Sequence, residues 1–396
     1  THGAPTERNA HPHVSMNGRV VLVHNGIVEN FKDLRQELAE EGVIFQSDTD
    51  TEVIVQLAER YMAAGMSLEQ AAQHTIRHLE GANAIVMMSA NSPLGIGEDE
   101  MFIASDIPAI LEYTRKMVFL ESRQMAVATR KGYRVMDLDN QVIHPQVHKI
   151  AWDPVSAVKG EYKHFMQKEI FDQPRAIIDT LGGRIDFENG SVHLPEMNLT
   201  PELVSQIDKI FIIACGTSYY AGLVGKYLIE TIARLPVEAE YASEFRYYNP
   251  IIDKNTAVLS ITQSGETADT LAAAEQARTH GATLWAIVNA IGSQSMRLSD
   301  GSIPMHAGPE IGVASTKAFT TSLVDLYLLA CALGAMREKL SAADLRRLTD
   351  DVTHLPALVG RVLERDTEYQ QLAEHFYKAK NFLFLGRGIN YPIALE

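Results

Sequence analysis

Short apolar segments alternate with small-residue loops and helix-like segments in the second half of this chain. Residues 209–214 (KIFIIA), 256–262 and 283–288 are apolar at nearly every position, and the first two are each followed by a loop rich in Gly, Ser and Thr. A strand that is apolar throughout is buried on both faces, which is typical of a parallel sheet covered by helices. Residues 316–336 are predicted as a long apolar helix. The alternation of strands with helices predicts a doubly wound α/β domain.

The first 150 residues mix short strand-like and helix-like segments. Residues 19–23 (RVVLV) predict a strand, and Asn30 stands where it can cap the helix that follows. Thr49 and Glu52 have the spacing of a capping box, which predicts the start of a second helix. Further strand-like segments recur at residues 84–88, 101–104, 118–120 and 125–128. We expect an α+β domain here.

Changes in this pattern divide the chain into segments. They place the α+β domain at residues 1–150, a polar connector with an entry helix at 151–205, the α/β domain at 206–345 and a last segment at 346–396. The last segment repeats the outline of the unit at 209, with a strand at 382–385, a Gly-Arg-Gly loop and a helix from Ile393 onward. We therefore expect a second copy of the α/β domain to begin here. Because the sequence starts without Met and stops inside a predicted helix, we expect it to be a piece of a longer chain.

Composition and charge argue against several classes of protein. A net charge of −15 over 396 residues is unlike a nucleic-acid-binding protein, which usually has a basic face. No apolar run approaches the ~18 residues that suggest a membrane-spanning helix. Two cysteines in so long a chain do not build a disulfide framework, which favours a reducing, cytoplasmic compartment. Cys331 is expected in a helix core, and Cys215 has no sequence neighbour that marks it as activated.

Four histidines near the start of the chain raise the question of a metal site: His2, His11, His13 and His24. No HExxH or Cys/His finger spacing accompanies them. We therefore expect no metal site.

The loop after the first apolar strand, Cys215-Gly216-Thr217-Ser218, is a candidate ligand site. Loops at the carboxyl ends of strands in an open α/β sheet bind ligands, because their amides and the following helix dipole converge there. The hydroxyls of Thr217 and Ser218 are suited to phosphate oxygens. The alternative is a simple helix cap in which Gly216 makes the turn.

The loop after the second apolar strand, residues 262–267 (TQSGET), has a similar character. It offers the hydroxyls of Thr262, Ser264 and Thr267 and the amide of Gln263. By itself Ser264 is also consistent with an ordinary helix cap. Two such loops on neighbouring strands would form a hydroxyl-rich cradle for a phosphosugar.

A third segment, residues 310–317 (EIGVASTK), also precedes a predicted helix. Its small residues let the backbone approach a ligand, and Ser315 can donate a hydrogen bond. The alternative is an ordinary N-cap with Thr316 and Lys317 in solvent. None of these loops is a Walker loop, since no Gly-Lys-Ser/Thr run is present.

Asn25-Gly26, at the end of the first predicted strand, permits two interpretations. Asn-Gly is a strong hairpin-turn signal. Alternatively, the Asn25 side-chain amide and the Gly26 N–H point together at an oxyanion, where losing one donor costs about 3 kcal/mol of barrier stabilisation. Asp50 is either an acid favoured by the dipole of a first helical turn or a ligand for a substrate ammonium group.

At these loops the sequence resembles the family of isomerising glutamine–fructose-6-phosphate aminotransferases, the glucosamine-6-phosphate synthases. The resemblance extends over most of the chain. Its most specific segments, in the order of the family, are THGAPTERNAHPH, VHNGIVEN, SDTDTEV, FMQKEI, ACGTSYYAG, QSGETADT, EIGVASTKAFTT and LGRGINYPIALE. The family has a glutaminase domain of the Ntn-hydrolase type followed by two sugar-isomerase (SIS) domains, so the resemblance implies a partial glutaminase domain, one SIS domain and the start of a second.

The resemblance also implies roles for particular residues. Asn25 and Gly26 would form the glutaminase oxyanion hole, Asp50 would bind the glutamine α-amino group, and Thr1 and His2 would line the same pocket. The residues matching the family's phosphosugar-binding loops are Thr217, Ser218, Thr262, Gln263, Ser264 and Thr267. Val313 and Ser315 match positions that close over the sugar. The family often has Ser where this chain has Thr262, a departure that keeps the hydroxyl.

Other family residues match no position of this sequence. The N-terminal cysteine nucleophile and the arginine that binds the glutamine carboxylate would precede Thr1. The isomerase glutamate base, the Schiff-base lysine and a histidine contributed by a partner subunit would follow Glu396. Near residues 90–92 the chain is also shorter than the family pattern.

The expected activity is the conversion of fructose-6-phosphate and glutamine into glucosamine-6-phosphate and glutamate, without a metal or organic cofactor. We expect a cytoplasmic homodimer that binds no nucleic acid and no membrane. One alternative is a phosphosugar-sensing regulator, which would have no use for the glutaminase-like segments before residue 60. Another is an amidotransferase acting on phosphoribosyl pyrophosphate, which would need a phosphoribosyl-type domain instead of the SIS loops. A purely structural protein fits least.

Overall fold

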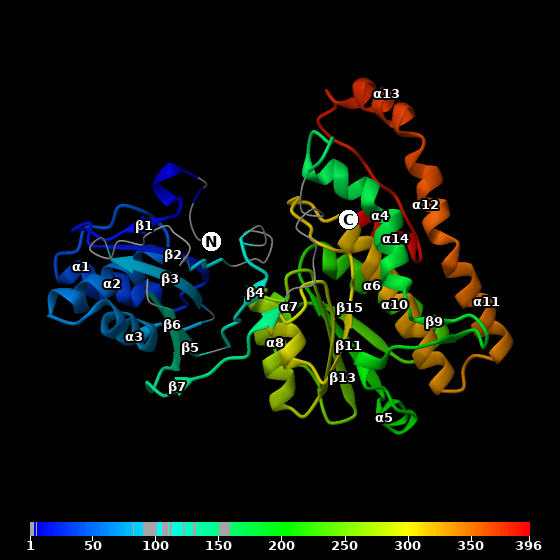
Figure 1. Cartoon of the computed structure of the whole chain (residues 1–396), viewed down its shortest axis with the longest axis horizontal. Helices are drawn as coiled ribbons and strands as arrows, with labels where there is room; N and C mark the ends of the chain where they lie inside the picture. Colours follow the sequence, from blue (N-terminus) through cyan, green and yellow to red (C-terminus); the bar gives the residue numbers. More distant parts are fainter. Residues whose placement is uncertain are drawn as a thin grey trace. The chain divides into compact units, whose positions relative to one another are not determined.

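The computed structural model describes residues 4, 6–81, 83–89, 101–104, 110, 113–121, 123–129, 132–149 and 159–396. The chain divides into two compact units, each described by itself below: Thr1–Ser105 with Lys116–His148, and Asp106–Arg115 with Lys149–Glu396 (Figure 1).

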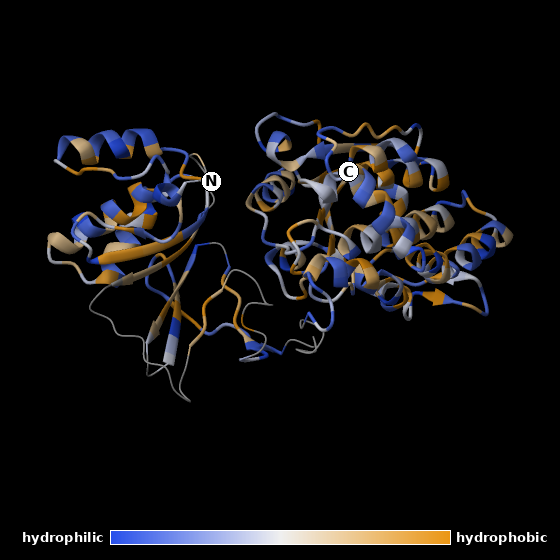
Figure 2. Ribbon diagram, turned by 90° about the horizontal axis from the view of Figure 1, so that it is seen from above, coloured by the Kyte–Doolittle hydropathy of each residue, from blue (hydrophilic) through white to orange (hydrophobic). Residues whose placement is uncertain are grey.

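The N-terminal unit is built on an antiparallel sheet with strand order β1-β2-β3. In chain order its described elements are η1 (Glu7–Asn9), β1 (His13–Val14), β2 (Val20–Gly26), α1 (Phe31–Glu40), α2 (Thr51–Ala63), α3 (Leu68–His78), β3 (Asn83–Ser89), β4 (Lys116–Met117), β5 (Gln124–Thr129), β6 (Gly132–Asp137), β7 (Val142–Ile143) and β8 (His148–Lys149). In Figure 2 several strands of this unit are coloured hydrophobic and others carry hydrophilic segments, and the helices beside them mix hydrophobic and hydrophilic residues.

Local sequence explains β2 and α1. Val20, Leu22 and His24 are buried and alternate with more exposed residues, as the period of a strand with one buried face requires. Leu34 and Leu38 are the buried residues of α1, spaced by one helical turn. The strand and both helices predicted here are therefore confirmed.

The predicted cap and strand details are confirmed only in part. Asn30 occupies the N-cap position of α1, but its side chain bonds His78 O and Glu80 N instead of the helix. The segments at 84–88 and 125–128 lie in β3 and β5, whereas 101–104 and 118–120 are irregular, so those two strand predictions are wrong. Strands form only where a neighbour pairs with them, which sequence pattern alone does not show.

The C-terminal unit contains a five-stranded parallel sheet with strand order β12-β11-β13-β14-β15. Its described elements are α4 (Phe165–Leu181), β9 (Ile185–Asp186), β10 (Ser191–Val192), η4 (Pro195–Met197), α5 (Pro201–Gln206), β11 (Lys209–Ala214), α6 (Thr217–Ile232), β12 (Val237–Tyr241), α7 (Ala242–Phe245), β13 (Thr256–Thr262), α8 (Ala268–Thr279), β14 (Thr283–Val288), α9 (Gln294–Leu298), β15 (Gly301–Pro304), α10 (Lys317–Met336), α11 (Ala342–Thr353), α12 (Leu355–Leu363), α13 (Asp366–Phe376) and α14 (Asn390–Leu395). The doubly wound α/β domain predicted from the sequence is confirmed.

Alternate residues of β11 face opposite sides of this sheet. Ile210 and Ile212 belong to a core that includes residues of α6 and α10. Phe211 and Ile213 belong to a second core that includes residues of α7 and α8. Helices thus cover both faces of the sheet (Figure 1), and this is why β11 is apolar throughout.

The sequence analysis missed the two edge strands, β12 and β15. The sequence of β12, VEAEY, alternates polar and apolar residues, and β15 is short and ends at Pro304. Proline is tolerated at a sheet edge because its missing N–H is not needed there. Edge strands carry less of the apolar signal on which the prediction relied.

The predicted strand at 382–385 is wrong. Residues 381–387 are irregular, and Phe382 and Leu385 are exposed, because no neighbouring segment pairs with them among the described residues. The helix that follows is α14. Before it, helices α11 to α13 lie between Ala342 and Phe376.

Helix α10 is long and apolar enough to cross a membrane by length and composition alone. Two thirds of its apolar window (67%) is buried within the C-terminal unit. We therefore assign α10 as the central core helix of this unit.

Candidate functional site

The two loops predicted to bind a phosphosugar leave neighbouring strands at the same edge of the sheet. Strands β11 and β13 are adjacent and parallel, with Ile213 paired to Ser260. From β11 the chain continues to β12 on one side of this pair, and from β13 it continues to β14 on the other side. This is the topological switch point, where open α/β sheets bind their ligands.

In the first loop Gly216 takes the N-cap position of α6, with φ 55° and ψ −136°, a conformation that favours glycine. The hydroxyls of Thr217 and Ser218 do not cap the helix, so Gly216 makes the turn. Thr217 Oγ1 donates to Glu396 Oε1 at 2.7 Å. Thr270 Oγ1, in the first turn of α8, lies 3.9 Å from Cys215 Sγ and connects this loop to the helix that follows the second loop.

The second loop is held by its own side chains. Thr262 Oγ1 is buried and accepts the Gly265 N–H at 3.1 Å, and it lies 3.4 Å from Thr267 Oγ1. Ser264 Oγ accepts the Glu266 N–H at 3.2 Å. Helix α8 has Thr267 as its N-cap residue, so the alternative in which Ser264 caps it is wrong.

Residues after β14 support this loop, and the sequence analysis did not identify them. Glu266 Oε1 accepts the Gln294 N–H at 2.8 Å, and burial raises the pKa of the Glu266 carboxyl. The Ser295 N–H donates to Gly265 O, and the Ala290 N–H donates to Gln263 O. These contacts therefore fix the loop on two sides.

Asn289 connects these loops to the third predicted segment. It is buried, its Nδ2 donates to Gly308 O at 2.7 Å, and its Oδ1 accepts the Ala307 N–H at 3.1 Å. The segment leads from β15 to α10, so it lies at the same edge of the sheet as the other two loops. Asn289 directly follows the apolar strand β14. This position, at the carboxyl end of a buried strand, could have identified Asn289 from the sequence as a candidate site residue.

In the third segment Val313 is fully exposed, and Ser315 Oγ donates to Glu310 Oε2 at 3.0 Å. Thr316 is the N-cap residue of α10 but makes no side-chain cap. Lys317 is buried, so the alternative that placed it in solvent is wrong. Burial lowers the pKa of Lys317, and Asp172, 3.5 Å away, opposes that shift.

In the N-terminal unit, Asn25 and Gly26 are the last residues of β2, and Gly26 has φ 142°. They pair with β3, which follows three helices later, so the hairpin-turn alternative is wrong. Asp50 is almost fully buried, and its Oδ2 accepts the Val28 N–H at 2.8 Å. Val28 follows shortly after the end of β2, so this hydrogen bond holds the Asp50 carboxylate beside the chain that leads on from Asn25 and Gly26.

His24 is a second link between β2 and α2, and the sequence analysis assigned it no role here. One ring nitrogen lies 3.0 Å from Thr51 Oγ1, and the other lies 2.9 Å from Asn83 Oδ1. Burial lowers the pKa of His24, which favours the neutral ring. His24 directly precedes Asn25 in the chain, and Thr51 directly follows Asp50. The contact between His24 and Thr51 therefore restricts the positions of both Asn25 and Asp50.

Thr1 and His2, assigned to the glutamine pocket by resemblance, lie outside the described residues. Within the described part of the chain, no three His, Cys, Asp or Glu side chains are grouped so that they could hold a metal ion.

Comparison with known proteins assigns both units. Residues 4–112 match the model of the glutamine amidotransferase domain, and residues 203–332 match that of the SIS domain. The chain is 43% identical over 411 aligned residues to the glutamine–fructose-6-phosphate aminotransferase [isomerizing] of Chlorobaculum tepidum, with 100% of this chain and 67% of the relative covered. The namesake enzymes of Thermococcus kodakarensis and Thermus thermophilus are 43% and 42% identical, with the same coverage.

A solved structure supports the assignment of the C-terminal unit. The C-terminal domain of glucosamine-fructose-6-phosphate aminotransferase from Francisella tularensis superposes with a TM-score of 0.57 and 39% identity, covering 60% of this chain and 66% of that one.

The chain thus joins a glutamine amidotransferase domain to a SIS domain of parallel-sheet architecture. It belongs to the family of isomerizing glutamine–fructose-6-phosphate aminotransferases. The presence of both domains argues against a phosphosugar sensor and against an amidotransferase with a phosphoribosyl-type domain.

Proposed function

We propose that the protein transfers ammonia from glutamine to fructose-6-phosphate and isomerises the product to glucosamine-6-phosphate. The observation that carries this proposal is the pairing of an amidotransferase domain with two hydroxyl-rich loops at the switch point of a SIS sheet. No cofactor is required by this chemistry, since glutamine supplies the nitrogen and the sugar carbonyl accepts it.

In the glutamine half, the Asn25 side-chain amide and the Gly26 N–H stabilise the oxyanion formed when a cysteine nucleophile attacks the glutamine amide. By family resemblance that cysteine would precede Thr1. The buried Asp50 carboxylate binds the substrate α-ammonium group, for which its burial and negative charge suit it. The attachment of Asp50 to the Val28 N–H keeps this carboxylate at the end of β2.

In the sugar half, we assign phosphate binding to Thr217, Ser218, Ser264 and Thr267, with Thr262 and Gln263 shaping the second loop. Loop amides, hydroxyls and the N-terminus of α6 together favour a dianionic phosphate without a basic residue. Val313 and Ser315 lie in the segment that covers the sugar. A chain with net charge −15 can bind this anion because the attraction is local.

The test uses the complete protein that carries this sequence and measures glutamine-dependent formation of glucosamine-6-phosphate. We expect Asn25→Ala to lower glutamine turnover by 10²–10³-fold, the typical cost of one oxyanion donor, with fructose-6-phosphate binding unchanged. Ser264→Ala should raise the KM for fructose-6-phosphate and leave basal glutamine hydrolysis unchanged. If Ser264→Ala left both the KM for the sugar and turnover at wild-type values, the phosphate assignment would be wrong.

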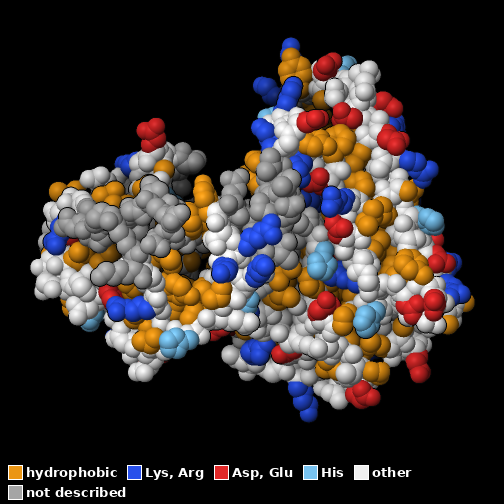
Figure 3. Space-filling model, in the orientation of Figure 1, with side chains coloured by type: hydrophobic (Ala, Val, Ile, Leu, Met, Phe, Trp, Pro, Cys, Tyr) orange, Lys and Arg blue, Asp and Glu red, His pale blue; other side chains and the backbone are white. Residues whose placement is uncertain are grey.

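We also propose that the protein is a cytoplasmic homodimer. The resemblance implies that a partner subunit contributes to the sugar site, and both cysteines are free, as a reducing compartment allows. Four apolar side chains of α12 and α13 are exposed and provide surface for association: Leu358, Val362, Leu372 and Phe376. Figure 3 shows hydrophobic side chains interspersed with charged ones on the surface. Sedimentation that gives a monomer mass at all concentrations would contradict the dimer.

A further inference from the structure

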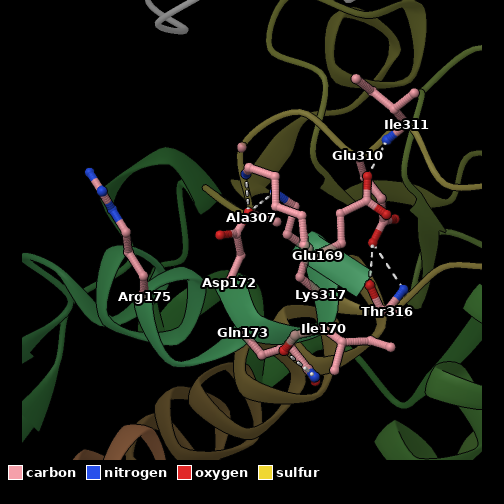
Figure 4. Close-up of polar contacts among 12 residues, drawn as sticks. Glu169, Ile170, Asp172, Gln173, Arg175, Ala307, Glu310, Ile311, Thr316 and Lys317 are labelled. Carbon is pink, nitrogen blue, oxygen red and sulfur yellow. Dashed lines mark hydrogen bonds and ion pairs between the residues drawn. The ribbon is translucent and has the colours of Figure 1, made fainter. Parts of the chain in front are cut away.

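Two buried glutamates hold the segment that leads from β15 to α10. Glu169, in the first turns of α4, is 2% exposed, and Glu310, within the segment, is 7% exposed. Both carboxylates are directed at backbone N–H groups of residues 311–318 (Figure 4). Buried carboxylates are costly unless hydrogen-bonded, and here both find partners in one short stretch of backbone.

Glu169 binds the beginning of the stretch. Its Oε1 accepts the Ile311 N–H at 2.6 Å and the Gly312 N–H at 3.0 Å, and its Oε2 lies 3.2 Å from Gly312 N. Hydrogen bonds to an ionised acceptor are about twice as strong as neutral ones. A Cβ at Gly312 would lie 2.5 Å from Glu169 Oε2, so the backbone and the carboxylate are in close contact.

Glu310 binds the end of the stretch. Its carboxylate accepts the Ser315 hydroxyl at 3.0 Å, the Thr316 N–H at 2.9 Å and the Ala318 N–H at 3.1 Å. A negative charge is favourable at this place because it lies at the N-terminus of the long helix α10. Between the two attachments Val313 remains fully exposed to solvent.

The same face of α4 makes two more contacts with the start of α10. Asp172 Oδ2 lies 3.5 Å from Lys317 Nζ, and Gln173 Oε1 accepts the Thr320 hydroxyl at 2.6 Å. Glu169, Asp172 and Gln173 are three and four residues apart, so they share one helix face (Figure 4). Helix α4 thus supports the junction between the segment and α10.

We propose that Glu169 is a positioning residue for the sugar site, because it fixes residues 311–312 and thereby sets where Val313 and Ser315 lie over the sugar. This inference rests on the proposed function of the C-terminal unit. The reason is preorganisation: a segment that is ordered before binding loses less conformational entropy when the sugar arrives. Glu169 itself is directed at the backbone and needs no contact with substrate.

The first test compares Glu169→Asp and Glu169→Gln with wild type in the complete protein. The shorter Asp withdraws the acceptor from both amides, so we expect the KM for fructose-6-phosphate to rise about tenfold or more, since the loss of even one hydrogen bond to a charged group has an effect of that size. Gln keeps one acceptor oxygen and should show a smaller rise. Hydrogen exchange at the Ile311 and Gly312 amides should accelerate in the same order, which a purely structural role of Glu169 in α4 would not cause.

A second variant approaches the same contact from the other side. In Gly312→Ala the new methyl group would press on the Glu169 carboxylate, so it should also raise the KM for fructose-6-phosphate. Gly360→Ala is the matched control, since no atom lies within 4 Å of the added Cβ. Asp179→Asn, on an exposed part of α4, is the control for the glutamate variants and should leave KM and exchange unchanged.

The outcomes separate this inference from the proposed function. If Ser264→Ala weakens fructose-6-phosphate binding but Glu169→Asp and Gly312→Ala do not, the positioning role is wrong and the proposed function stands. A wild-type KM with a lowered melting temperature would likewise show a structural role only. If neither Ser264→Ala nor the Glu169 variants change the KM for fructose-6-phosphate, the proposed function of the C-terminal unit is itself wrong.

Discussion

At the residue scale, Gly265 shows how much the loop after β13 depends on one position. Its φ is +71°, in the left-handed region, and an added Cβ would overlap Ser293 Oγ and Cβ. Ser293 is buried, so it has little room to move away. Both the backbone conformation and the close approach therefore require glycine here.

We predict that Gly265→Ala disrupts this loop. The left-handed conformation alone costs a residue with a Cβ about 1–2 kcal/mol, and the overlap with Ser293 adds to this. Gly183→Ala is the matched control, because Gly183 has φ +74° but nothing within 4 Å of the added Cβ. Denaturant unfolding and the KM for fructose-6-phosphate should both be more affected at 265 than at 183. Equal effects would show that overlap with Ser293 is unimportant.

We further predict a pH dependence of stability that originates at His24. Burial lowers its pKa below the ordinary value of 6.5. As the pH falls through 6.5, the unfolded chain therefore takes up a proton before the folded unit does, and stability declines until the folded pKa is passed. For one proton the slope does not exceed about 1.4 kcal/mol per pH unit. Thermal unfolding of His24→Gln, measured between about pH 5 and 7, should show a shallower decline than wild type, and an unchanged slope would contradict this origin.

At the element scale, an ion pair inside the C-terminal unit connects α10 to the turn after α4. Arg184 Nη1 lies 2.6 Å from Asp325 Oδ1, and the two side chains are 4% and 0% exposed. Arg184 also donates to Pro304 O at the end of β15. Burial raises the pKa of Asp325 well above its usual range, and Arg184 opposes that shift. The pair thus sets how α10 packs beside the edge of the sheet.

We predict that Asp325→Ala lowers the free energy of unfolding of this unit by about 3–5 kcal/mol, because it leaves the Arg184 charge buried without its partner. The double variant Arg184→Met/Asp325→Leu should recover part of this loss, since it removes both charges and keeps volume. Chemical denaturation monitored at Trp285, which is buried in the same core, measures both. A double variant less stable than Asp325→Ala would contradict this account.

At the scale of the whole molecule, each unit has a core of its own. Residues of β2, α1 and α2 form one core, and the strands and helices of the parallel sheet form the others. Chains built in this way do not follow a single two-state transition. The residues proposed for the glutamine site and those proposed for the sugar site lie in different units, so we expect the two ligands to stabilise different cores.

We therefore predict two calorimetric transitions that respond to different ligands. Fructose-6-phosphate should raise the transition of the C-terminal unit, and glutamate, the product of the glutamine half, should raise that of the N-terminal unit. A ligand at 100 times its Kd stabilises the unit that binds it by about 2.7 kcal/mol. A single transition that both ligands shift equally would show that the units unfold together.

Some features of this protein follow from the sequence by itself. Strands β11, β13 and β14 have the predicted bounds because segments buried on both faces are apolar at every position. The loops after β11 and β13 were identified as candidate sites from their small and hydroxyl-bearing residues alone. Local composition carries this information because burial and turn geometry act on each segment separately.

Other features were decided only by the tertiary structure, because they depend on partners far away in the chain. Thr49 Oγ1 accepts the Glu52 N–H as a capping box requires, but the Glu52 carboxylate binds the amides of Gln46 and Ser47 instead of completing the box. The attachment of Glu169 to Ile311, like the strand order that places two loops at one switch point, has no signal in local periodicity. Such contacts arise when buried polar groups find the nearest donor in the folded chain, and that donor is chosen by packing.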